Sequence, residues 1–338
     1  MVLCDFARID VTLCHRPTMR NLDTVEEQMA YIAQYFQQTD YNTTTDYLVL
    51  KFNNEQLHCD LNIIDSLEEG ADKFSFSVWN VPDDVMFAQD DIILFRYYWQ
   101  DDSSRYTIYH GQILSISTDR SGADWKTTIT GEIIHSNLMY NWSAYRRISL
   151  VKYYSDIASI VSSEIGLTLK THIEEFFDNI PLTEPILTYN KTVGEVLTDV
   201  CAQLSTENVK CRWKIINNDL FIYKVNELDH AIFNEAYDID TLVVKYDDLL
   251  EFTSVNDNQV QFKAFGLPAV KAGVVIELNS NGAPDYITWK TDFLIVDEVE
   301  HSITADDGYI STVYAHILGT VVESEDEDYN EDYDESEY

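Results

Sequence analysis

The feature that most constrains this chain is a period-two alternation of apolar and polar side chains between Leu48 and Leu138. In 73–82, apolar residues stand at 74, 76 and 78, with small polar residues between them. Successive side chains of a β-strand point to opposite faces, so this pattern places one face in a core and the other toward water. Similar segments follow at 91–99, 105–118 and 125–134. The alternation predicts an antiparallel β-domain of six or seven strands, a barrel or a sandwich.

Turn residues indicate how some of these strands connect. Asn53 and Asn54 predict a hairpin between strands at 47–52 and 55–64. A polar loop at 119–124 predicts a second hairpin. Upstream, Val2–Leu13 fits a strand, and Thr24–Phe36 has helical spacing with Asp23 or Thr24 as its N-cap.

After residue 146 the pattern changes to that of an α+β module. Ser149 is a candidate N-cap for a first helix, and Gly166 provides its stop. Thr192 opens a second helix, with Glu195 as its capping-box partner. The predicted helices and the hairpin that follows them lie at 150–165, 193–204 and 210–224.

Strand patterns then return, at 242–245, 259–265, 273–278, 293–299 and 309–318. The sequence therefore predicts a mainly β fold with an α+β insert, in which two β-barrel-like domains flank a helix–helix–hairpin module. The predicted parts are an N-terminal extension at 1–45, a first β-barrel domain at 46–146, the α+β module at 147–238, a second β-barrel domain at 239–320 and a disordered acidic tail at 321–338.

The strongly negative charge of the chain argues against a nucleic-acid-binding function. The 338 residues carry a formal net charge of −37, and the part before Glu323 still carries −27. Such a protein repels a nucleic-acid backbone rather than holding it by counterion release. No run of 18 apolar residues and no secretory signal is visible, so we expect no membrane span and folding in a cytoplasm. The tail at 323–338 has three readings: a solubilising segment, a tether for a basic partner, or a cation-binding segment.

Signatures of catalysis or metal binding are missing from the sequence. The five cysteines form no CxxC pair, so Cys201 and Cys211 are expected to be reduced core residues. The eight histidines form no HExxH motif, and no GxSxG, P-loop or GxGxxG motif occurs. We therefore expect neither a cofactor nor enzymatic activity, although a pair of carboxylates distant in sequence could still form a glycosidase site.

Five residues are candidates for an interface. Tyr97, Tyr98 and Trp99 end a predicted strand, where the rings either pack in the barrel or anchor a partner, since Tyr and Trp are enriched in protein contacts. Arg146 and Arg147 form a rare basic spot, which either pairs with nearby acids or contacts a neighbouring subunit.

The order of these pieces carries a family resemblance. The matching segments are Gly111–Ile113 and Thr127–Thr130 in the first domain, Trp79–Pro82, the hairpin sequence WKIINNDLFI at 213–222, and 268–276 and 293–301 in the second domain. This arrangement resembles the tail hub proteins of contractile-tail phages and related injection systems, the late-control D and VgrG-like hub superfamily. The resemblance covers about residues 46–320 and includes no catalytic signature.

The resemblance implies a structural role in viral genome ejection. Such hubs are homotrimers in the virion tail baseplate, assembled in the host cytoplasm. Two similar barrels per chain form a pseudo-sixfold ring that adapts a six-fold tail tube to a three-fold spike. The implied partners are the tube, the spike and other baseplate proteins, and DNA passes through the channel only as cargo. Three copies with two like modules present six similar edges, and each open edge strand is a docking surface.

Two other hypotheses stay open at this stage. The chain could be a receptor- or carbohydrate-binding tail module, in which Tyr97, Tyr98, Trp99 and Tyr106 stack on sugars. It could also be a peptidoglycan hydrolase within a hub.

Overall fold

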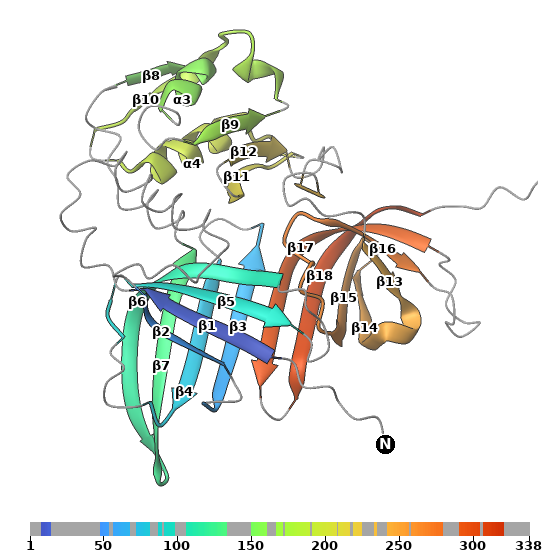
Figure 1. Ribbon diagram of the computed structural model, residues 1–338. Coiled ribbons are helices and arrows are strands. Elements are labelled where there is room, and N and C mark those ends of the chain that lie inside the picture. The colour runs from blue at the N-terminus through green and yellow to red at the C-terminus, as the bar shows by residue number, and fades with distance from the viewer. Residues whose placement is uncertain are drawn as a thin grey trace, which may run out of the picture.

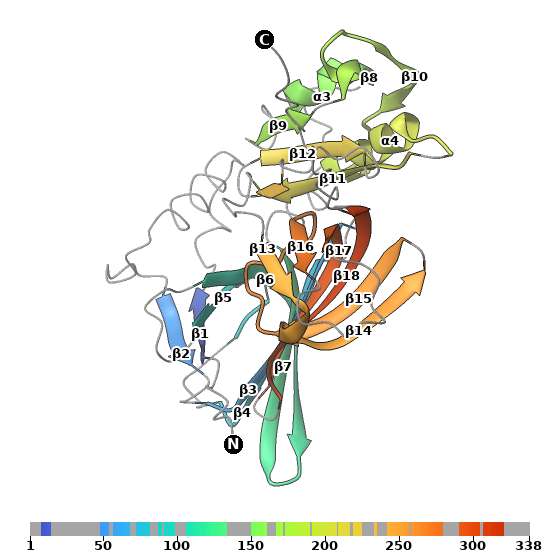
Figure 2. The same cartoon turned by 90° about the vertical axis from the view of Figure 1, so that its right-hand side faces the viewer.

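The computed structural model describes residues 8–14, 48–53, 57–67, 72–81, 87–89, 91–98, 106–133, 150–160, 167–171, 173–189, 191–207, 209–216, 219–224, 233–234, 242–256, 258–279, 291–304 and 307–320. Over these residues the chain is mainly β, which confirms the prediction of a mainly β fold. Its strands form one 13-stranded sheet and two smaller sheets of two and three strands. The α+β unit lies on one side of the large sheet in two perpendicular views (Figures 1 and 2).

The large sheet consists of two parts that we call the first and second repeats. The first repeat comprises β1 (Arg8–Cys14), β2 (Leu48–Asn53), β3 (Cys59–Ser66), β4 (Lys73–Trp79), β5 (Ile92–Tyr98), β6 (Tyr106–Ser121) and β7 (Asp124–Ile133). The second comprises β13 (Leu242–Lys245), β14 (Leu249–Asn256), β15 (Gln259–Phe265), β16 (Val275–Asn279), β17 (Thr291–Thr304) and β18 (Gly308–Thr320).

The two repeats share one strand order. Neighbouring strands run β3-β4-β7-β6-β5-β1 in the first repeat and β14-β15-β18-β17-β16-β13 in the second. In chain order, β3, β4, β5, β6 and β7 therefore correspond to β14, β15, β16, β17 and β18. The repeats differ at one end: β2 has no counterpart among the described strands, and β13 runs parallel to β16 whereas β1 runs antiparallel to β5.

The pairing register also repeats. β4 pairs with β7 from Lys73 opposite Glu132 to Trp79 opposite Lys126. β15 pairs with β18 over the same number of positions, from Gln259 opposite His316 to Phe265 opposite Ile310. The positions of the β-bulges in the two repeats give the same residue-by-residue alignment of one repeat with the other.

A bulge interrupts the longest hairpin of each repeat at the same place. The register between β6 and β7 shifts between Ile113 and Ser115, and the register between β17 and β18 shifts between Val296 and Glu298. One residue before each shift, the pairing with the strand on the other side ends, at Gln112 on β6 and at Ile295 on β17. Bulges bend a strand locally, so both long strands leave their own repeat at an equivalent point.

Each repeat buries the inward side of its alternating strands. The first core contains Ile63, Phe76, Phe95 and Ile129, and the second contains Phe262, Leu294 and Val313. The core residues of β3 and β4 stand at every second position, at 59, 61 and 63 and at 74, 76 and 78, and Val260 and Phe262 of β15 do the same in the second core. The period-two pattern of the sequence is thus the direct cause of the two cores.

The α+β unit has its own core and lies between the repeats in sequence. It comprises β8 (Leu150–Tyr153), α3 (Tyr154–Ile160), β9 (Thr168–Thr171), η4 (Glu174–Phe176), β10 (Pro181–Leu187), α4 (Val193–Leu204), β11 (Cys211–Ile216) and β12 (Asp219–Lys224). β11 and β12 form the predicted hairpin, and β9 adds to β12 in parallel. Cys201 and Cys211 are buried and are not joined in a disulfide, as expected for reduced core residues.

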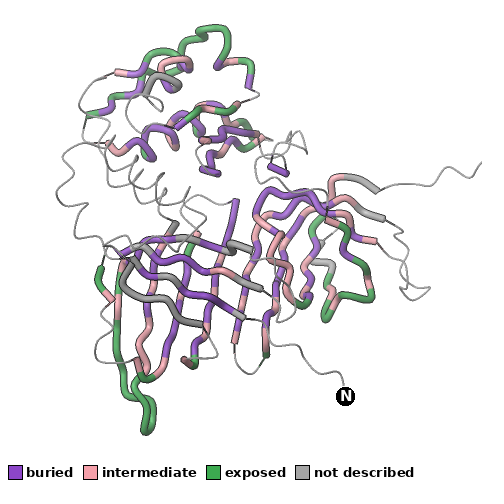
Figure 3. Tube along the Cα trace, viewed as in Figure 1, coloured by how far each residue is buried: buried purple, intermediate pink, exposed green. Residues whose placement is uncertain are grey.

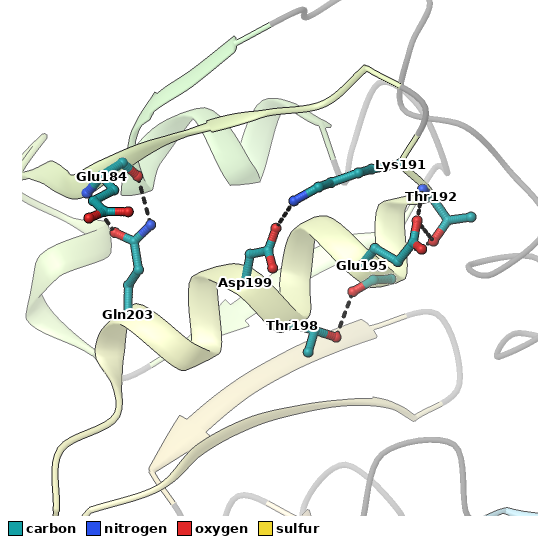
Figure 4. Close-up of polar contacts among 8 residues, drawn as sticks. Glu184, Lys191, Thr192, Glu195, Thr198, Asp199 and Gln203 are labelled. Carbon is teal, nitrogen blue, oxygen red and sulfur yellow. Dashed lines mark hydrogen bonds and ion pairs between the residues drawn. The ribbon is translucent and has the colours of Figure 1, made fainter.

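Helix α4 begins where the sequence indicates. Thr192 Oγ1 accepts a hydrogen bond from Glu195 N at 3.2 Å, and Thr192 N donates to Glu195 Oε2 at 2.6 Å. This capping box satisfies two backbone N–H donors that the first turn would leave without partners. At the other end of the helix, Gln203 Nε2 donates to Glu184 O at 2.7 Å, which ties α4 to β10 (Figure 4).

Two predicted elements are wrong. The hairpin around Asn53 and Asn54 does not form, because β2 pairs with β1, while β3 pairs with β4 and β17. The first helix of the α+β unit does not begin at Leu150, because Leu150–Tyr153 is strand β8 on β10. Asp156 Oδ2 accepts hydrogen bonds from Lys152 N and Tyr153 N, which fixes the strand-to-helix transition.

Other predictions are not tested by the structure. The predicted helix at 24–36 and the acidic tail lie outside the described residues. The predicted domain boundaries stay a prediction, since the strands of both β-segments share one continuous sheet.

Candidate functional site

The two repeats meet through strands β17 and β3, and this joint is the first part of the candidate site. After its bulge, β17 pairs with β3 from Glu298 opposite Ser66 to Ile303 opposite Leu61. Asn62 Nδ2 donates to Glu300 Oε1 across the joint at 2.7 Å. Ile303 therefore belongs to the first repeat's core although its strand comes from the second repeat.

A buried histidine lies within this joint. His301 is fully buried, and its Nε2 lies 3.1 Å from Val270 O. A carbonyl oxygen only accepts, so Nε2 carries the proton, and Nδ1 accepts from Tyr309 OH at 3.0 Å or Ser311 Oγ at 3.1 Å. Burial lowers the pKa of His301 to about 3, so the ring is neutral near pH 7 and serves as a structural hydrogen-bonding group.

A buried ion cluster fastens the α+β unit to the joint. Lys214 Nζ, from β11, donates to Asp65 Oδ1 at 2.5 Å and to Ser66 O at 3.0 Å, and lies 3.5 Å from Asp72 Oδ2. Asp65 Oδ2 accepts from Ala272 N at 3.1 Å. The Lys214 and Asp65 side chains are only 6% and 8% exposed. The Lys214–Asp65 pair therefore links the α+β unit, β3 and the segment that leads into β16.

An apolar cluster surrounds these charges and keeps water away from them. Its buried members come from the end of β3, the β11–β12 hairpin, the segment at 233–234, the segment before β16, and β17: Leu67, Ile216, Phe221, Tyr223, Phe233, Ala272 and Ile295. The three parts of the fold are thus packed together around the buried ion cluster, a much stronger attachment than a linker alone.

The pKa values of the two carboxylates in the cluster, Asp65 and Asp72, are shifted in opposite directions. Burial raises the pKa of Asp72 to about 7, against the opposing charge of Lys214. For Asp65, burial favours a higher pKa, but the charges of Lys214 and Lys271 outweigh it and lower the pKa. Asp65 is therefore the anionic partner of Lys214, and Asp72 gains or loses its proton near neutral pH.

We predict that Asp72 makes stability depend on pH. Because its pKa is higher in the folded chain than in the unfolded chain, the folded state holds the extra proton between about pH 4 and 7. Stability from this group is present below about pH 4 and is lost as the pH rises toward 7. Between pH 5 and 8, the free energy of unfolding measured with urea should fall by a few kcal/mol more for the parent than for Asp72→Asn. Each pH unit between the unfolded and folded pKa values of Asp72 contributes about 1.4 kcal/mol to this difference.

The exposed Asp119→Asn variant is the control and should follow the parent curve. Parallel pH profiles for the parent and Asp72→Asn would contradict the prediction.

The second part of the candidate site is the β6–β7 hairpin, which projects from the first repeat. Its lower half is exposed from Ser117 to Trp125 (Figure 3). Asn80, with a positive φ of 54°, holds the hairpin in place: its N donates to Trp125 O at 2.8 Å, and its Nδ2 donates to Asp124 Oδ1 at 2.9 Å. The hairpin is thus a supported arm that carries an aromatic side chain, Trp125, with 55% of its surface exposed.

The structure places only part of the predicted interface. Tyr97 and Tyr98 belong to β5, where Tyr97 pairs with Tyr106 of β6. The side chains of Tyr97 and Tyr98 and all of Trp99, Arg146 and Arg147 lie outside the described residues, so the interface stays a prediction. Sequence reasoning missed Trp125 because its neighbours at 119–124 resemble a loop. They instead extend both strands to a tight turn at Gly122 and Ala123.

Over the described ranges, no three His, Cys, Asp or Glu side chains gather in an arrangement that could hold a metal ion. Among the helices that the structure describes, none has both the length and the apolar character to cross a membrane.

Comparison with known proteins gives a fold but no sequence family. No protein-family profile matches the chain, and no curated protein matches it in sequence. Among solved structures, the 43 kDa tail protein of prophage MuSo2 from Shewanella oneidensis is similar with a TM-score of 0.51 and 10% identity, over 76% of this chain and 93% of that one. A tail protein from Neisseria meningitidis MC58 gives 0.51 and 10%, over 78% and 97%. A PdpA–VgrG complex gives 0.51 and 9%, over 94% of this chain and 66% of that one.

At these identities the likeness concerns the fold alone. The chain has the fold of phage tail proteins and is also similar in fold to a PdpA–VgrG structure. This agrees with the resemblance to tail and injection-system proteins that the sequence shows.

Proposed function

We propose that this chain is a structural tail hub, of which three copies form a ring with a central channel. The observation that carries the proposal is the internal repeat: one chain contains two sheet units with the same strand order, register and bulge position. The similarity to tail proteins supports the same reading.

The repeat offers a physical solution to a symmetry mismatch. A ring of three chains contains six similar units, so it can face a six-fold tube on one side and a three-fold spike on the other. The proposed partners are therefore a tail tube, a spike and neighbouring baseplate proteins, and the proposed location is the virion tail. With a net charge of −37, the ring would let DNA pass without holding it. We propose no catalytic role.

We expect the purified chain, alone or with tube and spike proteins, to form a particle with three times the mass of one chain. Native mass spectrometry gives the copy number, and electron microscopy should show a pseudo-sixfold ring with a channel. A chain that stays monomeric in the presence of tube and spike proteins would overturn the proposal.

A receptor- or carbohydrate-binding tail module is the second candidate function, and one observation favours it. Strands β5 and β6 pair at the backbone positions of Tyr97 and Tyr106, so two of the predicted sugar-binding residues are neighbours in the sheet. Glycan-array binding that is lost in Tyr106→Ala and kept in Tyr189→Ala would support it, and absence of binding would favour the hub.

A further inference from the structure

The joint inside one chain provides a template for a joint between two chains. Strand β17 of the second repeat pairs with β3 of the first. The shared strand order makes β6 the counterpart of β17, and β14 the counterpart of β3. The same joint could therefore form a second time, between β6 and a β14 strand.

Both of these strands lie at an outer edge of the described sheet, β6 after residue 115 and β14 over its whole length. Among the strands that the structure describes, β6 pairs only with β7 from Ser115 onward, whereas the equivalent part of β17, from Glu298 onward, pairs with both β18 and β3. At the other end of the sheet, β14 has β15 as its one partner within the described part of the chain. A strand edge of this kind is a ready template for pairing with another chain.

The two edges lie at opposite ends of the molecule. Figure 1 shows the β6–β7 hairpin at the outer side of the first repeat and β14 at the outer side of the second. A contact between the β6 edge of one copy and the β14 edge of another is therefore head to tail, the type of contact that closes into a ring. Every joint around that ring would have the polarity of the joint already present inside the chain.

The side chains at the equivalent positions support the template. On β17 and β18, Ile303 pairs with Tyr309, and both are 2% exposed in the first repeat's core. On β6 and β7, the equivalent pair is Arg120 and Trp125, and Trp125 is 55% exposed.

The two aromatic residues accept an equivalent backbone hydrogen bond. Asn80 N donates to Trp125 O at 2.8 Å, and Gly266 N donates to Tyr309 O at 2.9 Å. Trp125 thus occupies the place of a buried core residue and lacks the surface that would cover it.

We propose that β6 of one copy, over Ser115–Ser121, adds antiparallel to β14 of the next copy, and that Trp125 packs on the second repeat of that copy. This inference rests on the proposed ring and specifies its subunit contact. The register follows from the template: Ser302 faces Asn62 inside the chain, so Asp119 should face Thr253 between chains.

The surface that would receive Trp125 is apolar. In the internal joint, Tyr309 shares a core with Cys59 and Leu61. The equivalent positions on the second repeat are Leu249 and Phe252, both partly buried, and the neighbouring Leu250 is 46% exposed. Covering Trp125 and Leu250 together removes apolar surface from water on both copies, so pairing would be driven by burial as well as by backbone hydrogen bonds.

Cysteine cross-linking tests the register. Asp119→Cys combined with Thr253→Cys should give disulfide-linked dimers and closed trimers on mild oxidation, because paired residues have Cβ atoms about 5 Å apart. The matched control combines Thr118→Cys with Thr253→Cys, which places the thiols on opposite faces of the sheet and should give little product. Each single variant accounts for reaction with the native cysteines.

Trp125→Ala tests the packing. It should raise the protein concentration needed for assembly by at least about tenfold, as expected for a buried aromatic anchor. Tyr189→Ala removes a ring that is 61% exposed on the α+β unit and should leave assembly unchanged. Thermal unfolding of the monomer should be the same for both variants.

The possible outcomes distinguish a failure of the proposed β6–β14 contact from a failure of the proposed ring. A ring that forms without the Asp119–Thr253 cross-link, and that tolerates Trp125→Ala, would overturn this joint and leave the proposed function standing. A chain that forms no oligomer at any concentration, even with tube and spike proteins, would overturn both.

Discussion

Replacing Lys214 by alanine is expected to lower the free energy of unfolding by about 3–5 kcal/mol. Lys214 is the cation that contacts Asp65 in the buried cluster, and its removal takes away the ammonium group that lies 2.5 Å from the Asp65 carboxylate. A buried charge without its partner costs far more than the pair itself contributes. Urea unfolding, with the intrinsic fluorescence of Trp213 and its neighbours as the signal, measures the change.

Two further variants test whether charge is the cause. Lys214→Met combined with Asp65→Asn removes both charges and keeps a side-chain oxygen for Ala272 N, so it should recover much of the loss. Lys263→Ala breaks the exposed pair with Glu251, which has the similar length of 2.7 Å, and should change stability little. Equal losses for Lys214→Ala and Lys263→Ala would contradict the argument.

The parts of this fold that were predictable from the sequence depend on local signals. The capping box of Thr192 and Glu195 fixes the start of α4, and the hairpin of β11 and β12 has a short polar turn between two apolar runs. Alternation likewise predicts which residues are buried, because it records the face of the strand toward which each side chain points.

The choice of strand partners was not predictable, because it depends on contacts between distant residues. Asn53 and Asn54 favour a chain reversal, but β3 takes its partners from β4 and from β17, more than two hundred residues further along. The contact of Lys214 with Asp65 spans 149 positions, so nothing near either residue indicates it. A single alternating pattern fits many pairings, and packing of the whole sheet selects among them.

The same reasoning explains why the candidate site was only partly predicted. Aromatic clusters such as Tyr97–Trp99 attract attention in a sequence, whereas Trp125 stands alone beside polar residues. Its significance appears only when β7 is aligned with β18 and Trp125 falls on the position of the buried Tyr309. The information is in the comparison of two repeats whose sequences have diverged.

Gly131→Ala is expected to cost about 3 kcal/mol, because the first repeat has no room for a methyl group there. A Cβ atom at this position would lie 2.1 Å from Gln112 O and 2.3 Å from the Phe74 ring. The equivalent position in the second repeat holds Ala315, and the residue that pairs with it is Val260 rather than a phenylalanine. The two repeats thus fill the same space with glycine and phenylalanine in one and alanine and valine in the other.

This exchange predicts that the two substitutions compensate. Phe74→Val alone leaves a cavity beside Phe95 and should cost about 2 kcal/mol. With Gly131→Ala, the new methyl group occupies part of that cavity, so the double variant should be more stable than the sum of the single effects by about 1 kcal/mol or more. Urea unfolding of the four proteins in this cycle measures the coupling, and Gly131→Ala with Ile157→Val, in the α+β core, should show none. Strict additivity of Phe74→Val and Gly131→Ala would mean that the backbone contact with Gln112 O, rather than the space shared with Phe74, excludes a side chain at position 131.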